Sequence, residues 1–205
     1  MTEGRTLVLL RHGRTPWNHA GRIQGHQDVG LDDVGLAQAA RTAPVLAALA
    51  PALVWSSDLE RTRLTAAPLG DASGVPVTHD ARLREFGFGA YEAMDHVELE
   101  ARDPDSYHAL RRGDYDRVTH AEPTVEVRAR MVDAARDLLG HLEPGGTAVA
   151  VSHGGSIRVA TAALLGWPDG QLHTLRGLDN CGWAVLHEHP SDGLLRLAAY
   201  NRTAG

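Results

Sequence analysis

The chain has 205 residues, with 20 basic and 26 acidic side chains and a formal net charge of −6. Apolar residues make up 43% and charged residues 22%, which excludes a disordered tail or a fibre and favours one folded domain over residues 1–205. The acidic balance argues against a nucleic-acid partner, because proteins of that class present basic surfaces.

Two absences narrow the chemistry further. All 20 basic residues are arginine, which excludes mechanisms that need a lysine amine, such as a Schiff base or the lysine of a phosphate-binding P-loop. Cys181 is the only cysteine, which excludes an internal disulfide and a cysteine-based zinc cluster. The apolar stretches are too short for a signal peptide or a membrane span, so we expect a cytoplasmic protein with no membrane partner.

The first predicted elements are a strand, a loop and a helix. Residues 6–10 form a short apolar run that is typical of a buried strand. Residues 11–31 contain too many glycines and prolines for regular structure and are expected to form a loop. Asp32 or Asp33 is then expected to cap a helix that ends near residue 49.

Strands and helices continue to alternate in the middle of the chain. Residues 52–55 are predicted to form a second buried strand, and Asp58 to cap a helix that ends near residue 69. Residues 76–78 are expected to form a small strand, and residues 83–92 a loop punctuated by glycines.

Residues 93–121 are the weakest candidate for a core. From residue 92 to residue 116 there are eight acidic side chains against three arginines, and Pro104 and Gly113 interrupt the segment. We therefore predict a helical flap that lies over a site and is inserted into the single domain.

The second half of the chain predicts the rest of the sheet. An amphipathic helix is expected over 124–142, a strand over 147–151 and a helix over 156–165. Two further strands are expected over 182–187 and 194–200. This alternation predicts a three-layer α/β/α fold with a mostly parallel central sheet, in which ligands bind beyond the carboxyl ends of the strands.

A histidine follows two of these strand ends, and each is followed by glycine. His12 comes after the first strand and His153 after the strand over 147–151. A neutral imidazole is a competent nucleophile toward phosphorus near neutral pH, and a covalent intermediate divides a slow hydrolysis into two steps. The backbone N–H groups of Gly154 and Gly155 open a helix and can face an anion. The pattern indicates phosphoryl transfer.

Other residues near these histidines would supply charge and protons. Arg11 and Arg61 would hold the phosphoryl oxygens with planar, charged guanidinium groups, and Asn18 would add an amide donor. Glu85, in the glycine-punctuated loop, is the candidate general acid for the leaving alkoxide.

The segments around these candidates resemble the signature of the histidine phosphatase superfamily, which includes the phosphoglycerate mutases. Five segments match in the family's order, within the stretch from residue 7 to about residue 166, and they are 10–18, 21–35, 56–66, 82–92 and 151–155. A lone Arg-His-Gly triplet would be a weak signal, whereas five ordered segments are specific. Residues 177–183 and 200–201 look more like the small actinobacterial-type phosphatases, including those acting on sugar-linked phosphoglycerate.

The resemblance implies a phosphoglycerate mutase-like fold and a phosphatase acting on a small phosphorylated metabolite through a phosphohistidine. It implies that His12 is the phosphorylated nucleophile, and that Glu85 is the acid toward the leaving group and then the base toward water. It also implies that neither a metal nor a cofactor is required. The other pocket residues that it implies are Arg11, Asn18, Gln24, Gly25, Arg61 and His153.

The chain departs from the family's pattern at three places. Arg14 stands where Glu or Gln is usual, and it would add charge at the mouth of the pocket. The Glu-Gly pair that closes the proton-donor loop is Glu92-Ala93 here, and residues 120–123 replace the usual Gly-Gly-Glu-Ser. The resemblance therefore implies no contact with the substrate for residues 120–123.

Alternative interpretations stay open for several residues. Glu92 competes with Glu85 as the proton donor, and Arg61 could be a surface charge on its helix. Arg111 and Arg112 are similar to a pair in the cofactor-dependent mutases, but a solvated flap is the simpler interpretation.

His187 and His189 share one face of a predicted strand. A two-histidine metal site there is the alternative to a pair of exposed strand-end histidines, which we favour.

Two other functions also stay open. One is a cofactor-dependent phosphoglycerate mutase, which would need a long closing flap and carboxylate-binding charges. The other is a non-catalytic module that binds a phosphorylated ligand. A homo-oligomer is open in every case.

Overall fold

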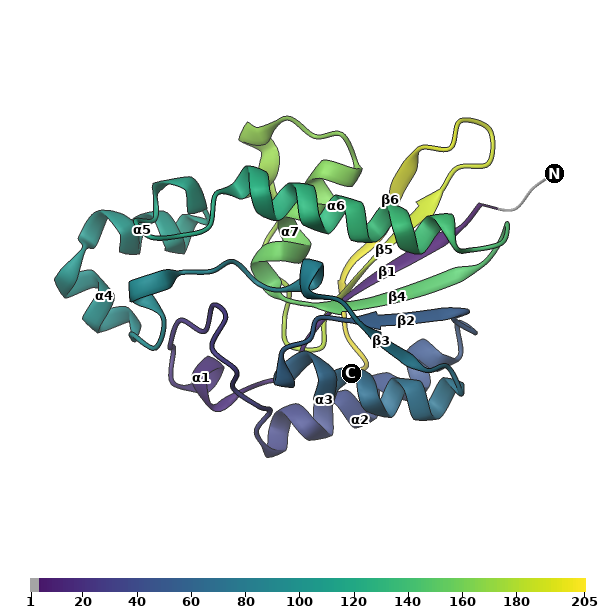
Figure 1. Cartoon of the computed structure of the whole chain (residues 1–205), viewed down its shortest axis with the longest axis horizontal. Coiled ribbons are helices and arrows are strands. Elements are labelled where there is room, and N and C mark those ends of the chain that lie inside the picture. The colour runs from purple at the N-terminus through teal and green to yellow at the C-terminus, as the bar shows by residue number, and fades with distance from the viewer. Residues whose placement is uncertain (1–3) are drawn as a thin grey trace.

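The computed structural model describes residues 4–205 and is built on a six-stranded sheet with the order β3-β2-β4-β1-β5-β6 (Figure 1). The strands are β1 (Thr6–Arg11), β2 (Leu53–Ser56), β3 (Val77–His79), β4 (Thr147–Ser152), β5 (Trp183–Glu188) and β6 (Leu195–Arg202). The pairs β1–β4, β2–β4 and β2–β3 are parallel, and β5 runs antiparallel to β1 and β6. The predicted mostly parallel sheet is confirmed.

Helices cover both faces of this sheet (Figure 1). α2 (Asp33–Ala47) and α3 (Glu60–Ser73) pack together on one face, and α6 (Thr124–Gly140) and α7 (Gly154–Leu164) on the other. Alternate side chains of β1 pack on opposite faces of the sheet. Val8 and Leu10 belong to one buried cluster, and Leu7 and Leu9 belong to the other. No helix within residues 4–205 is long and apolar enough to span a membrane.

The register of β1 against β4 brings the two histidines together. Arg11 at the end of β1 is paired with Ser152 at the end of β4, so His12 and His153 come next on adjacent strands. Their ring centres are 5.2 Å apart. The chain then continues toward α2 on one face and directly into α7 on the other (Figure 1). This divergence at adjacent strand ends is where sheets of this kind bind ligands.

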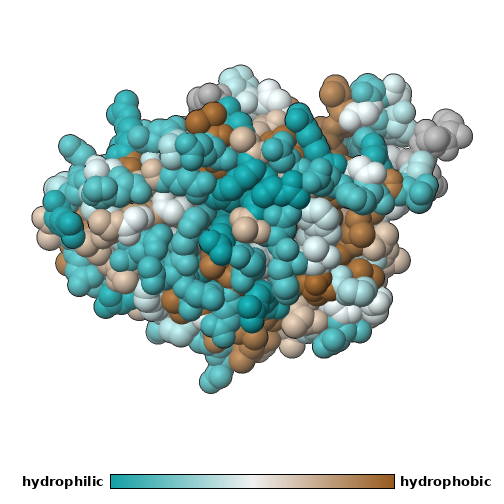
Figure 2. All heavy atoms as spheres, in the orientation of Figure 1, coloured by the Kyte–Doolittle hydropathy of each residue, from teal (hydrophilic) through white to brown (hydrophobic). Residues whose placement is uncertain are grey.

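The segment predicted as a helical flap does form helices. α4 (His96–Arg102) and α5 (Pro104–Arg112) lie at one end of the molecule, away from the sheet, on the left in Figure 1. Asp95 and Asp103 cap them by accepting hydrogen bonds from backbone N–H groups of the first turn. The face drawn in Figure 2 is predominantly hydrophilic over this end, as its charged composition predicts.

The structure corrects two local predictions. Asp58 does not cap α3, which begins at Glu60 after Leu59; the Asp58 carboxylate instead binds the Arg84 guanidinium through both oxygens, and Asp28 accepts the N–H of Glu60 at 2.6 Å. The loop predicted over residues 11–31 contains a one-turn helix, α1 (Pro16–His19). Pro16 sets its first position.

The loop after β1 can reach α2 only because two glycines face each other. A Cβ on Gly35 would lie 2.0 Å from the Arg14 carbonyl oxygen, and a Cβ on Gly13 would lie 2.6 Å from the Gly35 carbonyl oxygen. These contacts are with backbone, which cannot move aside cheaply. Close approach at Gly35 therefore fixes the loop that carries His12.

We expect Gly35→Ala to lower the free energy of unfolding by about 1–3 kcal/mol, as overpacking does in other cores. The matched control is Gly140→Ala, because no atom lies within 4 Å of the added Cβ there, and the expected effect is about zero or slightly stabilising. Urea denaturation of both variants measures the difference. Equal urea midpoints of unfolding for Gly35→Ala and the wild type would show that the close approach at Gly35 does not contribute to stability.

Candidate active site

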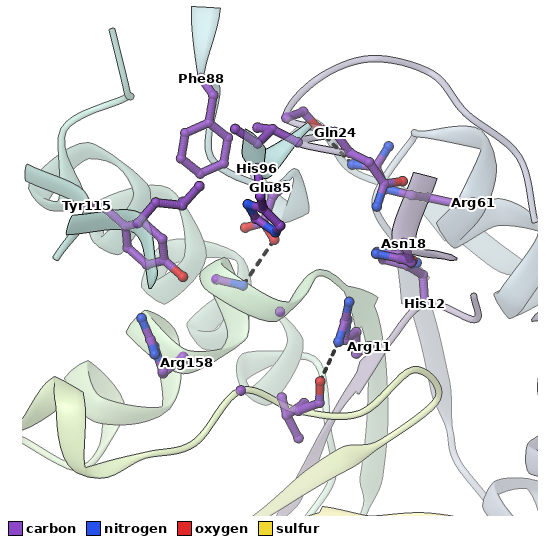
Figure 3. A pocket seen from close by; sticks show the side chains of 17 residues that line it. Arg11, His12, Asn18, Gln24, Arg61, Glu85, Phe88, His96, Tyr115 and Arg158 are labelled. Atoms are coloured by element: carbon purple, nitrogen blue, oxygen red, sulfur yellow. Dashed lines mark hydrogen bonds between the residues drawn. The ribbon is translucent and has the colours of Figure 1, made fainter. Parts of the chain in front are cut away.

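A cavity of about 260 Å³ lies at the carboxyl ends of β1 and β4, beside the flap helices (Figure 3). Eight of the nine predicted site residues line it, and the ninth, His153, is fully buried behind them. The lining also includes residues that the sequence did not single out, among them Ile23, Phe88, His96, Leu110, Tyr115 and Arg158.

His12 presents one ring nitrogen to this cavity. Its Nδ1 lies 2.7 Å from the Gly13 carbonyl oxygen, an acceptor, so Nδ1 carries the proton and Nε2 keeps its lone pair. Burial, followed by the nearby charges of Arg61 and Arg11, holds the pKa of His12 well below 6.5. A neutral imidazole with a free Nε2 is the form that can attack phosphorus.

Two guanidinium groups flank that imidazole. Arg11 donates from Nη1 to the Leu178 carbonyl oxygen, and its Nε is buried with no hydrogen-bond partner in the described chain. Arg61 is fully buried, which removes the interpretation that it is a surface charge. Burial lowers the pKa of Arg61 to about 10, so both its charge and its donors persist at neutral pH.

Arg61 is held in place by three hydrogen bonds. Its Nη1 and Nη2 donate to the carbonyl oxygens of Gln27 and Gly25, each at 2.7 Å, and its Nε donates to His153 Nδ1 at 3.2 Å. His153 Nε2 therefore carries the ring proton and faces Ser57 Oγ at 3.1 Å. Burial and then the Arg61 charge keep the pKa of His153 well below 6.5. In this structure His153 orients Arg61 rather than lining the cavity.

Two side-chain amides complete this end of the cavity, and Thr15 holds both. The Thr15 N–H donates to Asn18 Oδ1 at 3.1 Å, and the Thr15 hydroxyl donates to Gln24 Oε1 at 2.9 Å. Because the oxygens are engaged, the two NH₂ groups remain as donors toward the cavity. Sequence reasoning missed Thr15; its signal is an N-cap threonine followed three residues later by a polar partner.

We expect Thr15→Val to lower kcat/KM for a phosphomonoester about 5- to 10-fold, chiefly through a higher KM. The valine has nearly the same shape but cannot hold the Gln24 amide, and a net hydrogen bond contributes roughly 1 kcal/mol. Steady-state kinetics and the inhibition constant of inorganic phosphate measure the effect. Thr15→Ser, which keeps the hydroxyl, is the control, and equal losses in the two variants would contradict the role of that hydroxyl.

Glu85 reaches the cavity from the loop after β3. Its Oε2 accepts the Gly155 N–H at 3.0 Å, and its Oε1 accepts the Ser156 N–H at 2.9 Å and the Ser156 hydroxyl at 3.0 Å. The Gly155 N–H, which the sequence predicted to face the anion of a ligand, thus binds the Glu85 carboxyl group instead. Gly154, one residue earlier, lines the cavity beside Arg11.

The rival proton donor, Glu92, has a different environment. Its Oε1 accepts the backbone N–H groups of His26 and Phe88, each at 3.0 Å, and its Oε2 accepts from the Gln27 side chain at 3.0 Å. It is not among the residues that line the cavity. Geometry therefore favours Glu85 over Glu92 as the group that can reach a leaving oxygen.

Arg130 on α6 supports the loop that carries Glu85. It donates to the carbonyl oxygens of Arg84 and Glu85 and forms an ion pair with Glu122 at 2.9 Å. Glu122 also accepts the Gly87 N–H at 3.3 Å. Residues 120–123, for which the resemblance implied no contact, therefore help to hold the loop that carries Glu85. In the sequence, Arg130 is one of several charged residues on an amphipathic helix, so no local pattern distinguishes it.

The remaining predicted charges lie outside this cluster. Arg14 pairs with Asp32 at 2.8 Å, and Arg111 is exposed on α5. His187 faces Thr6 and His189 faces Ser191, so they point to different partners. Within the described residues no group of three or more His, Cys, Asp and Glu side chains could hold a metal ion.

Comparison with known proteins adds four matches. The chain matches the model of the histidine phosphatase superfamily (branch 1) over residues 7–201. It is 40% identical over 191 residues to the glucosyl-3-phosphoglycerate phosphatase of Mycolicibacterium vanbaalenii, covering 90% of this chain and 85% of that protein. It is 37% identical over 192 residues to the probable phosphoglycerate mutase GpmB of Erwinia tasmaniensis, covering 92% and 87%. A solved mycobacterial glucosyl-3-phosphoglycerate phosphatase in complex with VO3 gives a TM-score of 0.89 at 35% identity, covering 97% of this chain and 100% of that chain.

Proposed function

The chain belongs to the histidine phosphatase superfamily, and on this premise we propose that it is a phosphomonoesterase that works through a phosphohistidine at His12. One observation carries the proposal: a buried imidazole with a free Nε2 faces a cavity to which two guanidinium groups and two amide NH₂ groups also turn. These donors suit the three equatorial oxygens of a phosphoryl group in transfer.

In the first step, the Nε2 lone pair of His12 forms a bond to phosphorus while the ester P–O bond breaks. The departing alkoxide takes a proton from the Glu85 carboxyl, which lines the same cavity. Arg11 and Arg61 offset the negative charge that spreads over the phosphoryl oxygens. The products of this step are phospho-His12, ionised Glu85 and the free alcohol.

In the second step, the Glu85 carboxylate accepts a proton from a water molecule whose oxygen attacks phosphorus. The N–P bond breaks, inorganic phosphate forms and the His12 lone pair returns. One carboxyl group thus serves as acid and then as base. Hydrogen bonds from the start of α7 and from Ser156 hold the Glu85 carboxyl group, which supports its use in both steps.

The size of the cavity and the similar proteins together guide the choice of substrate. A volume of about 260 Å³ lies below the usual range for drug-sized ligands, which favours a small phosphorylated metabolite. Two of the similar proteins are named glucosyl-3-phosphoglycerate phosphatases, so a sugar-linked phosphoglycerate is our first candidate. Phosphorylated metabolites are too charged to cross membranes unaided, and we place the activity in the cytoplasm.

The similarity to a probable phosphoglycerate mutase makes mutase activity the second candidate. The test is to supply a panel of phosphomonoesters and to measure phosphate release, together with conversion of 3- to 2-phosphoglycerate by ³¹P NMR. We expect phosphate release to dominate. Conversion faster than release would establish a mutase, and tight phosphate binding without turnover of any ester would establish a binding module.

A further inference from the structure

Arg158 is a buried guanidinium that the steps above do not use. It lies on α7, one helical turn after Gly154, and lines the same cavity. Its residue is 9% exposed, and its Nε is buried without a hydrogen-bond partner in the described chain. Its Nη2 donates to the Gly113 carbonyl oxygen at 3.2 Å. No acidic side chain of the described residues forms an ion pair with it.

A glycine at the end of α5 provides the space that the Arg158 guanidinium occupies. Gly113 ends α5 in the left-handed conformation, with φ 75°, and a Cβ there would lie 1.5 Å from Arg158 Nη2. The guanidinium carbon lies 5.2 Å from the centre of the Tyr115 ring. An aromatic face stabilises a cation only in part, so a buried positive charge remains without an anion.

Tyr115 adds a hydroxyl to the same region. A Cβ on Gly155 would lie 3.1 Å from the Tyr115 hydroxyl and 2.8 Å from Glu85 Oε1, so the hydroxyl and the carboxylate flank one point of α7. Burial raises the pKa of Tyr115, which keeps it a donor. Figure 3 shows Arg158 and Tyr115 on one side of Glu85, and His12 and Arg61 on the other.

The placement of these groups constrains how an ester can bind. If phosphorus lies at His12 and the leaving oxygen at Glu85, the alcohol part of the substrate extends toward Arg158 and Tyr115. A guanidinium without a counter-ion in a desolvated site is costly unless an anion arrives to pair with it. A carboxylate suits this place, because it is planar, accepts two parallel hydrogen bonds from arginine and needs little space.

We propose that Arg158 and the Tyr115 hydroxyl bind a carboxylate on the alcohol part of the substrate. The proposal rests on the proposed function and makes it more specific: the preferred substrates are phosphomonoesters of hydroxy acids. Arg158 is a specificity residue, because it touches the substrate away from the reacting atoms.

The test compares two esters with the same three-carbon skeleton. 3-Phosphoglycerate carries a carboxylate where glycerol 3-phosphate carries a hydroxymethyl group. We expect the wild type to favour 3-phosphoglycerate in kcat/KM, and Arg158→Met to lower that preference by about 10- to 100-fold, the range for hydrogen bonds to charged groups. Tyr115→Phe is expected to lower it less, and Arg158→Lys to keep part of it. Arg136→Met, an exposed arginine of α6, is the control and should leave both rates unchanged.

Two results would overturn the proposal. One is that the wild type shows no preference between the two esters, a measurement that does not depend on the folding of any variant. The other is an Arg158→Met enzyme that loses activity on both esters equally, because a structural role has that signature. Hydrolysis of p-nitrophenyl phosphate, which has no carboxylate, tests the phosphatase activity separately from the carboxylate site. If the wild type hydrolyses neither p-nitrophenyl phosphate nor either of the two three-carbon esters, the proposed phosphatase fails rather than the carboxylate site.

Discussion

Replacing His12 by alanine is expected to lower the turnover of any phosphomonoester by about 10⁴-fold or more, as loss of a covalent nucleophile does in other enzymes. The variant keeps Arg11, Arg61 and both amides, so it should still bind inorganic phosphate. Release of phosphate from p-nitrophenyl phosphate and from an alkyl phosphate measures the loss. Phosphate affinity within about tenfold of the wild type would show that the pocket survives.

A second readout separates a nucleophile from a binding residue. Rapid quenching of the wild type with a ³²P-labelled ester should trap a phosphoprotein that is labile in acid and stable in base, as an N–P bond requires. His12→Ala should trap none. His141→Ala, an exposed histidine at the end of α6, is the control and should label normally. If His12→Ala turned over substrate at the wild-type rate, a phosphohistidine intermediate at His12 would be excluded.

The acid side of the pH profile tests the state of His12. Only the neutral imidazole can attack, and burial together with Arg61 and Arg11 lowers its pKa in the folded chain. The neutral form therefore dominates above pH 6.5, and activity limited by His12 protonation is lost only as pH falls well below that value. The kcat/KM profile, corrected for ionisation of the substrate, measures this. A loss centred at or above pH 6.5 would contradict the burial argument.

Local patterns in the sequence were enough to predict the fold. Short, mostly apolar runs predicted strands within one or two residues of those observed, since the central strands of a sheet covered on both faces are nearly continuous in apolar side chains. The Asp58 cap was wrong because its carboxylate is taken by Arg84, 26 residues away. A cap depends on the absence of a stronger distant partner, which no local pattern reveals.

The candidate site divides in the same way. His12 and His153 could be predicted to meet, because adjacent parallel strands bring their carboxyl ends together. Arg130 and Arg158 could not, since each acts through contacts with segments more than 40 residues away. Their side chains look like ordinary helix charges until the loop after β3 and the end of α5 are placed against them. The groups proposed to act at phosphorus are therefore readable from motifs. Arg130, which supports the Glu85 loop, and Arg158, which we propose to bind the substrate away from phosphorus, need the tertiary structure.

Replacing Glu85 by glutamine should reveal the proton donor through its dependence on the leaving group. For an alkyl phosphate, whose alkoxide needs a proton in order to leave, we expect the rate of His12 phosphorylation to fall about 10²- to 10⁴-fold. For p-nitrophenyl phosphate the fall should be much smaller, because nitrophenolate leaves without a proton. Single-turnover measurements of alcohol release for the two esters give the ratio.

The control for this ratio is Glu92→Gln. Glu92 fixes the backbone at His26 and Phe88, so its loss should loosen the pocket and slow both esters by a similar factor. In Glu85→Gln the new side-chain amide can still accept from Ser156 through its oxygen, but its nitrogen cannot accept the Gly155 N–H that Oε2 accepts in the wild type. Some loss common to both esters is therefore expected, and only the excess on the alkyl ester reports proton transfer. If that excess appears in Glu92→Gln and not in Glu85→Gln, the proton comes from Glu92, and the carboxyl group at the start of α7 serves only to hold that helix.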